Sequence, residues 1–69
     1  MKLSARNQFK GTVVAIERGA VNAIVKLDIG GGNVLTSSIT VAAVDELGLE
    51  VGKEAIAVVK ASSVMVGVE

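Results

Sequence analysis

The alternation of apolar and polar side chains is clearest between residues 21 and 29. The odd-numbered positions of this stretch are all apolar, and the even-numbered positions are mainly polar: Val21, Ala23, Val25, Leu27 and Ile29 against Asn22, Ile24, Lys26 and Asp28. A period of two puts the two sets on opposite faces of a strand, and the apolar set predicts that one face is buried. Ile24 interrupts the polar set, which indicates that the second face also contacts an apolar surface, that of another subunit.

Short stretches rich in apolar and β-branched residues, bounded by turn residues, predict four more strands. The first is rich in Val, Thr and Ile and contains Gly11, where a bulge or a sharp coil of the sheet is expected. The glycines of Gly30–Asn33 predict a hairpin turn, because a phosphate-binding glycine loop needs a helix at its end and a further strand follows here. The five predicted strands are residues 8–16, 21–29, 34–39, 55–59 and 64–68.

Only one segment, from Thr40 to Leu47, has the pattern of a helix. Thr40 suits the N-cap, Val41, Val44 and Leu47 share one face, and the glycine that follows stops the helix. Five short strands with a helix between the third and the fourth predict an all-β protein. The expected fold is a small, closed or nearly closed antiparallel barrel, OB-like in the order of its elements.

Composition limits how such a barrel is stabilised. The chain of 69 residues is expected to form one domain, residues 1–69, and a monomer of this size buries only about 60% of its unfolded surface. It has no cysteine for a disulfide or thiolate metal site and no histidine, the commonest metal ligand and general base. Its apolar fraction is 51% and its mean hydropathy is +0.62. We therefore expect a homo-oligomer in which neighbouring subunits cover much of the apolar surface.

Charge and aromatic content argue against several classes of partner. Seven basic and seven acidic residues cancel, and there is one aromatic residue, so neither electrostatic attraction to nucleic acid nor a stacking platform for single strands is expected. Charged residues break every apolar run before a membrane-spanning length of about 20 residues. The first residues lack the apolar core of a signal peptide. The expectation is a cytoplasmic protein with no nucleic-acid and no membrane partner.

Catalytic chemistry has little support in the sequence. Most carboxylates fall in predicted turns or on the exposed side of the helix, where they are solvated. Serine and threonine are plentiful, but no histidine is present to activate a hydroxyl. We therefore expect that the protein is not an enzyme.

Hydrogen-bond donors gather in two segments near the ends of the chain. Ser4–Gln8 carries a hydroxyl, a guanidinium and two amides, with no carboxylate before Glu17, and Lys60–Ser63 carries an ammonium and two hydroxyls. An unprotonated tetrahedral oxyanion only accepts hydrogen bonds, so an acid-free set of donors suits it. We expect the fold to bring the two segments together. On composition alone, simple exposure to solvent is the better explanation for Arg6 and Lys60.

Thr40 is a further candidate for binding an anion. The first helical turn after it, Val41–Ala43, has small side chains, so its N–H groups stay accessible and the helix dipole favours an anion there. An ordinary N-cap explains Thr40 equally well, and one hydroxyl can serve both purposes.

The donor segments and the sequence around them resemble the molbindins, small Mop-type proteins that bind molybdate and tungstate. The resemblance extends over essentially the whole chain and is carried by these stretches: Ser4–Gln8, Lys10–Gly11, Asn33–Thr40, Leu47–Glu54 and Val59–Met65. It implies an OB-like barrel, a homohexamer built as a trimer of dimers, and reversible binding of molybdate or tungstate between subunits for intracellular storage. It implies no cofactor and no side chain bonded directly to the metal.

Carried over by position, the resemblance divides the oxyanion site between two subunits. One subunit supplies Ser4 and Arg6, with Ala5 between them. The partner supplies Thr40, the backbone at Ala43, and Lys60, Ala61 and Ser62. A second class of site near threefold axes is implied as well; residues 17–22 are a candidate stretch without assigned ligands.

Three other hypotheses stay open at this point. The first is a structural assembly module that binds anions incidentally, which the high apolar content fits. The second is binding of a molybdenum cofactor in place of the bare oxyanion. The third is an OB-type oligonucleotide binder, which zero net charge and a single aromatic residue disfavour.

Overall fold

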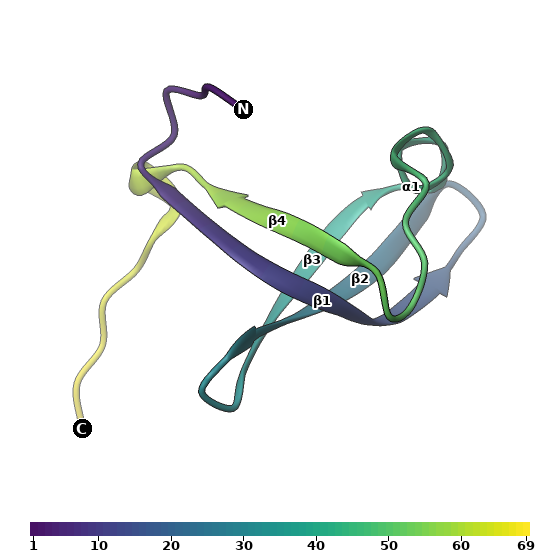
Figure 1. The fold of residues 1–69 in the computed structure, drawn as a ribbon. Helices are drawn as coiled ribbons and strands as arrows, with labels where there is room; N and C mark the ends of the chain where they lie inside the picture. Colours follow the sequence, from purple (N-terminus) through teal and green to yellow (C-terminus); the bar gives the residue numbers. More distant parts are fainter.

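The computed structural model describes residues 1–69 as one antiparallel sheet with a short helix and a 3₁₀ turn (Figure 1). The elements in chain order are β1 (Asn7–Arg18), β2 (Asn22–Gly30), β3 (Asn33–Thr40), α1 (Val41–Leu47), β4 (Glu54–Val59) and the turn η1 (Ala61–Ser63). The order in the sheet is β3-β2-β1-β4, so β3 and β4 form its two edges. The predicted mainly-β architecture, with one helix between the third and fourth strands, is confirmed.

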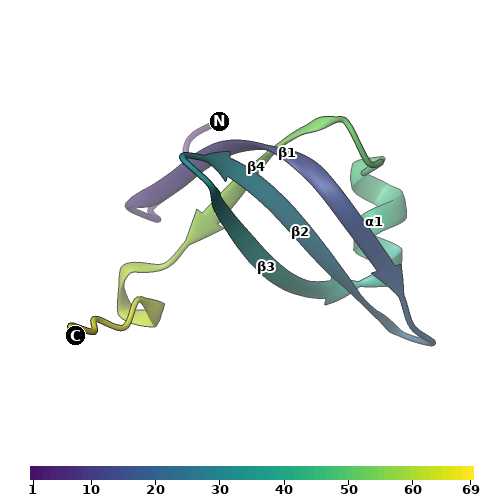
Figure 2. The ribbon, with the colours of Figure 1, turned by 90° about the horizontal axis from the view of Figure 1, so that it is seen from below.

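The predicted fifth strand does not form within the single chain. Val64–Val68 pairs with no other strand, is exposed, and leads away from the sheet after η1 (Figures 1 and 2). The barrel is therefore open between β3 and β4. A strand forms only where a neighbour accepts its backbone hydrogen bonds, and the chain does not turn back to such a neighbour after η1.

β1 bends at a bulge that lies further along the chain than predicted. Its register against β2 shifts between Val13 and Ala15, which makes Val14 the extra residue. Gly11, where the sequence predicted the irregularity, is instead a point of close backbone contact. A Cβ atom at Gly11 would lie 2.6 Å from the backbone oxygen of Asp28. Of the two expectations at Gly11, a bulge or a sharp coil, the bulge is wrong. Glycine is required there because a side chain has no space.

β2 and β3 are joined by a two-residue turn. Gly30 pairs with Asn33, and the two residues between them, Gly31 and Gly32, have φ angles of 63° and 79°. Positive φ at both positions is typical of the type I′ turn, whose twist matches that of the flanking strands. The prediction of a hairpin turn rather than a phosphate-binding loop is confirmed.

α1 begins and ends at the predicted caps. Thr40 is the N-cap, and Gly48 ends the helix in the left-handed region at φ 63°. The N–H groups of Gly48 and Leu49 donate to the carbonyl oxygens of Asp45 and Val44, each at 3.1 Å, which is the Schellman arrangement. No helix of the chain is long and apolar enough to span a membrane.

The core is small and lies where β2 packs with β1 and α1. Its five buried residues are Val13, Ala23, Val25, Leu27 and Val44. Three of them are alternating side chains of β2, as the pattern predicted. Two predicted core positions are instead about two-thirds exposed, Val21 at 68% and Leu47 at 69%. Val21 precedes β2 in a turn and Leu47 is the last helical residue, while Leu49 packs against the core after the chain reverses.

Candidate functional site

The pairing of β1 with β4 brings the two donor segments together. Asn7, the first residue of β1, lies opposite Val59, the last residue of β4. The Asn7 amide also donates a hydrogen bond of 3.2 Å to the Val59 carbonyl. Because the strands are antiparallel, the residues just before Asn7 must lie beside those just after Val59. Figure 1 shows the N-terminal segment next to η1 at this end of the sheet.

The two segments line an open hollow of about 550 Å³, here called the donor hollow. Its lining residues are Ser4, Ala5, Arg6, Val58, Lys60, Ala61 and Ser62. It contains two hydroxyls, a guanidinium and an ammonium, and no carboxylate lines it. Six of the eight predicted site residues therefore meet at one place in a single chain. They include residues of both sets that the resemblance assigned to different subunits.

The two cations of the donor hollow have no carboxylate partner. The ion pairs of the chain are Lys10–Glu54, Arg18–Asp45 and Lys53–Glu50. Lys53 shows the contrast, since its Nζ atom lies 2.7 Å from Glu50. This hydrogen bond and the charge of Lys53 hold the pKa of the Glu50 carboxyl below its ordinary value of 4.5. The donor groups of Arg6 and Lys60 instead form no ion pair within the chain and can bind a ligand.

Side-chain amides give the N-terminal segment its shape. Gln8 donates to the Ala5 carbonyl at 3.3 Å, and Asn7 donates to Val59 as described. The sequence predicted that these two amides are donors of the anion site. In the structure the Gln8 amide closes a turn within the segment and the Asn7 amide holds it against β4, and neither lines the donor hollow.

Backbone hydrogen bonds form η1 on the other side of the hollow. The N–H of Ser63 donates to the Lys60 carbonyl at 2.8 Å, and the N–H of Val64 donates to the Ala61 carbonyl at 3.2 Å. The N–H groups of Ala61 and Ser62, at the start of the turn, take no part in these bonds. They add backbone donors beside the Lys60 ammonium.

Thr40 and Ala43 lie outside the donor hollow. They are at the start of α1, at the opposite end of the sheet from η1 (Figures 1 and 2). The Thr40 hydroxyl oxygen accepts the Ala43 N–H at 3.0 Å, which confirms the N-cap. The Ala43 N–H is thereby used within the chain, whereas the hydroxyl hydrogen of Thr40 is still able to donate. Within one chain the structure does not bring these two residues to the other six.

Sequence reasoning missed Val58, which lines the donor hollow. Val58 lies on β4 two residues before Lys60, and its side chain is 42% exposed. Residues two apart in a strand share a face, so period two was the signal that could have found it. It gives the hollow an apolar surface beside the charged groups.

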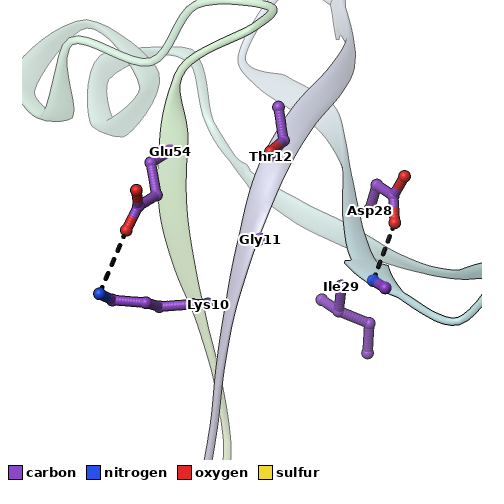
Figure 3. Close-up of a pocket in the computed structure, with 7 residues that line it drawn as sticks. Lys10, Gly11, Thr12, Asp28, Ile29 and Glu54 are labelled. Carbon is purple, nitrogen blue, oxygen red and sulfur yellow. Dashed lines mark hydrogen bonds and ion pairs between the residues drawn. The ribbon is translucent and has the colours of Figure 1, made fainter.

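A second hollow, of about 440 Å³, has different chemistry (Figure 3). It is lined by Lys10, Gly11, Thr12, Asp28, Ile29, Gly30 and Glu54. Glu54 lies 3.5 Å from the Lys10 ammonium, and Asp28 accepts the N–H of Gly30 at 2.8 Å. Two carboxylates on its wall disfavour an oxyanion there. No group of three or more acidic, histidine or cysteine side chains gathers anywhere to hold a metal ion directly.

Comparison with known proteins agrees with the fold and with the sequence resemblance. The TOBE domain matches residues 3–66. The chain belongs to the TOBE-domain family. This TOBE-domain chain is 72% identical over 69 residues to a probable molybdenum-pterin-binding protein of Haemophilus influenzae, with 100% of both chains covered. It is 52% identical over 66 residues to molybdenum-pterin-binding protein 2 of Clostridium pasteurianum, covering 96% of this chain and 97% of the relative.

Solved structures show the same architecture. MopII from Clostridium pasteurianum, in an apo form, matches with a TM-score of 0.91 and 49% identity, over 97% of this TOBE-domain chain and 100% of MopII. The cytoplasmic molybdate-binding protein ModG, solved with molybdate bound, matches with a TM-score of 0.95 and 55% identity. That match covers 100% of this chain and 49% of ModG, so the chain spans about half of ModG. The resemblance to Mop-type molbindins and the OB-like fold are thus confirmed.

Proposed function

We propose that this TOBE-domain protein binds molybdate or tungstate reversibly in the donor hollow and stores the ion without reacting with it. The observation that carries the proposal is the chemistry of the hollow: two cations without carboxylate partners, hydroxyls and backbone donors, and no acid on the wall. The names of the relatives support it, since ModG is a molybdate-binding protein solved with molybdate. The protein acts as a binding protein and not as an enzyme.

Selectivity for molybdate and tungstate over hydrogenphosphate follows from the absence of carboxylate acceptors in the donor hollow. Molybdate and tungstate carry two negative charges and no proton, so every oxygen accepts hydrogen bonds. Hydrogenphosphate carries a proton that needs an acceptor, and an acid-free hollow offers few. Sulfate has the same charge and shape as molybdate but is smaller. The donor hollow must therefore reject sulfate by size.

The proposed binding unit is a homohexamer, a trimer of dimers, in the cytoplasm, with each 1–69 chain acting as one domain. The donor hollow is open on one side, and Thr40 and Ala43 lie at the far end of the same chain. We propose that the Thr40 hydroxyl and the backbone around Ala43 reach the oxyanion from a neighbouring subunit. A site closed in this way excludes water, which strengthens each charge-assisted hydrogen bond.

Substitution of the two unpaired cations tests the assignment. Arg6→Ala and Lys60→Ala each remove a charged donor worth about 1.5–3 kcal/mol, so we expect molybdate to bind roughly 10- to 100-fold more weakly. Isothermal titration calorimetry with molybdate, and with sulfate in parallel, measures the change. Native mass spectrometry of the same samples counts the bound ions and reports the assembly.

Two matched controls accompany these variants. Lys26→Ala removes an exposed cation of β2 that also lacks an ion-pair partner, and Lys53→Ala removes one that is paired with Glu50. Both make the same change in net charge, and we expect unchanged affinity for molybdate. Equal losses in all four variants would contradict the site, because they would indicate only a general effect of charge.

Binding of a molybdenum–pterin compound is the second candidate function. The observation in its favour is that relatives from Haemophilus influenzae and Clostridium pasteurianum are named molybdenum-pterin-binding proteins. The same calorimetry separates the two: uptake of free molybdate by the apo protein supports the oxyanion, and uptake of molybdenum only with the pterin supports the cofactor. Equal uptake of molybdate and sulfate would favour a structural module that binds anions incidentally.

A further inference from the structure

The donor hollow has one large apolar side chain on its wall, that of Val58. The other two apolar residues that line it, Ala5 and Ala61, carry only a methyl group each. The Val58 side chain has no hydrogen-bond donor to offer to an oxyanion. It therefore contributes volume and shape to the hollow and no hydrogen bond.

Val58 lies next to both halves of the hollow because β4 pairs with β1. Its partner across the ladder is Gln8, whose amide donates to the Ala5 carbonyl at 3.3 Å and closes the turn that carries Arg6. On the same strand as Val58, Lys60 follows two residues later with an extended backbone, at φ −64° and ψ 133°. Residues two apart in an extended chain share a face, so Val58 and Lys60 lie on the same face of β4.

Arg6 and Lys60 lie opposite each other one step beyond the end of the ladder. The last pair is Asn7 with Val59, and the same register continued by one residue sets Arg6 opposite Lys60. Like charges in this position repel each other, and no carboxylate of the chain forms an ion pair with either of them. A dianion between them replaces the repulsion by attraction, so the two donors close on the ion until other atoms stop them.

The side chain of Val58 is placed to stop this approach. Both methyl groups of valine are on Cβ, and this branching restricts the rotamers of the side chain, so it does not move aside as a long flexible side chain does. Forcing packed atoms closer together is costly. Around a small tetrahedral anion, the donors contact the valine before all of them reach an oxygen. A larger anion keeps the donors further apart and accepts from both sides without that contact.

We propose that Val58 determines the anion specificity of the donor hollow by limiting how closely the Arg6 and Lys60 donors approach each other. Molybdate and tungstate are large enough to contact both donors at that separation, whereas sulfate, with the same charge and shape, is too small. This inference rests on the proposed function, and it names the residue that sets the size on which rejection of sulfate depends.

Two substitutions of Val58 test the proposal. In Val58→Ala the donors close further, so we expect sulfate to bind more tightly and the ratio of the sulfate Kd to the molybdate Kd to fall about tenfold, as for the loss of methyl groups from a binding pocket. Val58→Thr keeps the branched shape and adds a hydroxyl that can donate to either anion, so we expect this ratio to stay at its wild-type value. Isothermal titration calorimetry with each anion measures both dissociation constants.

Ile56→Ala is the matched control. Ile56 lies on the same face of β4 as Val58, and each side chain is 42% exposed. Both residues also line the apolar groove of the sheet, but Ile56 does not line the donor hollow. Any effect of lost apolar volume on stability or assembly is therefore common to the two alanine variants, and we expect Ile56→Ala to leave the ratio of the two dissociation constants unchanged.

The outcomes separate this inference from the proposed function. An unchanged ratio in Val58→Ala, or an equal fall in Ile56→Ala or Val58→Thr, would overturn the role of Val58 alone, since the wild-type protein would still select molybdate. A wild-type protein that binds molybdate and sulfate alike would overturn the proposed function and the role of Val58 together.

Discussion

At the residue scale, Gly11 shows how one position is constrained by a distant part of the chain. The sequence predicted an irregular strand at Gly11, but the reason why this position needs glycine is visible only in the three-dimensional structure. A Cβ atom at Gly11 would lie 2.6 Å from the Asp28 oxygen and 3.2 Å from the Cγ2 atom of Ile29. The first contact is with backbone, which cannot rotate away as a side chain does.

Gly11→Ala is expected to destabilise the protein by about 1–3 kcal/mol, because β1 and β2 must separate to admit the methyl group. Urea unfolding followed by circular dichroism measures the difference. Lys10→Ala is the control on the neighbouring residue; it breaks only an exposed ion pair with Glu54, and we expect a loss of about 0–1 kcal/mol. A Gly11→Ala protein as stable as Lys10→Ala would show that the strands adjust without cost.

At the scale of elements, the start of α1 serves two proposed purposes. Thr40 satisfies the Ala43 N–H inside its own chain, and it is proposed to donate its hydroxyl hydrogen to an oxyanion from a neighbour. These two roles make different demands on the side chain. Capping needs only an oxygen that accepts, whereas binding needs the hydroxyl hydrogen.

Three substitutions at Thr40 separate the two roles. Thr40→Ala is expected to cost about 1 kcal/mol of stability through loss of the cap and also to weaken molybdate binding. Thr40→Ser keeps both roles, and Thr40→Asp keeps the cap but replaces a donor by an anion. Thermal unfolding and molybdate calorimetry are measured on all three. Unchanged affinity in Thr40→Asp would show that Thr40 is a cap and nothing more.

At the scale of the whole molecule, the fold of a single chain leaves much of its apolar surface exposed to solvent. Only 5 of 69 residues are buried, and fourteen large apolar side chains are exposed. A core of this size supplies little stability. The proposed oligomer removes much of this surface from water, so folding and association are expected to be coupled.

The midpoint temperature of unfolding, Tm, is therefore expected to depend on protein concentration. Each tenfold dilution weakens association by about 1.4 kcal/mol, which for a chain of this size shifts Tm by several degrees. Differential scanning calorimetry over a hundredfold range of concentration measures the shift. A constant Tm would mean that the single chain is stable alone, in contradiction to the coupling.

Much of this molecule followed from local patterns. The alternation in β2, the I′ turn at Gly31 and Gly32, and the caps Thr40 and Gly48 are local requirements of backbone geometry, and they were predicted correctly. The predictions that failed concern positions whose structure depends on pairing or packing with other parts of the chain. The bulge lies at Val14, where the pairing register of β1 against β2 shifts, and Leu47 is exposed as the last residue of α1, directly before the chain reverses.

By itself, the sequence determined which residues carry donors, the four strands of the sheet, where the helix begins and ends, and the family resemblance. These depend on neighbours within a few positions and on residue chemistry. Only the tertiary structure decided that Ser4–Arg6 and Lys60–Ser62 meet, because this follows from the register that sets Asn7 opposite Val59. It also decided that Val64–Val68 has no partner in its own chain, since whether a strand forms depends on what lies beside it.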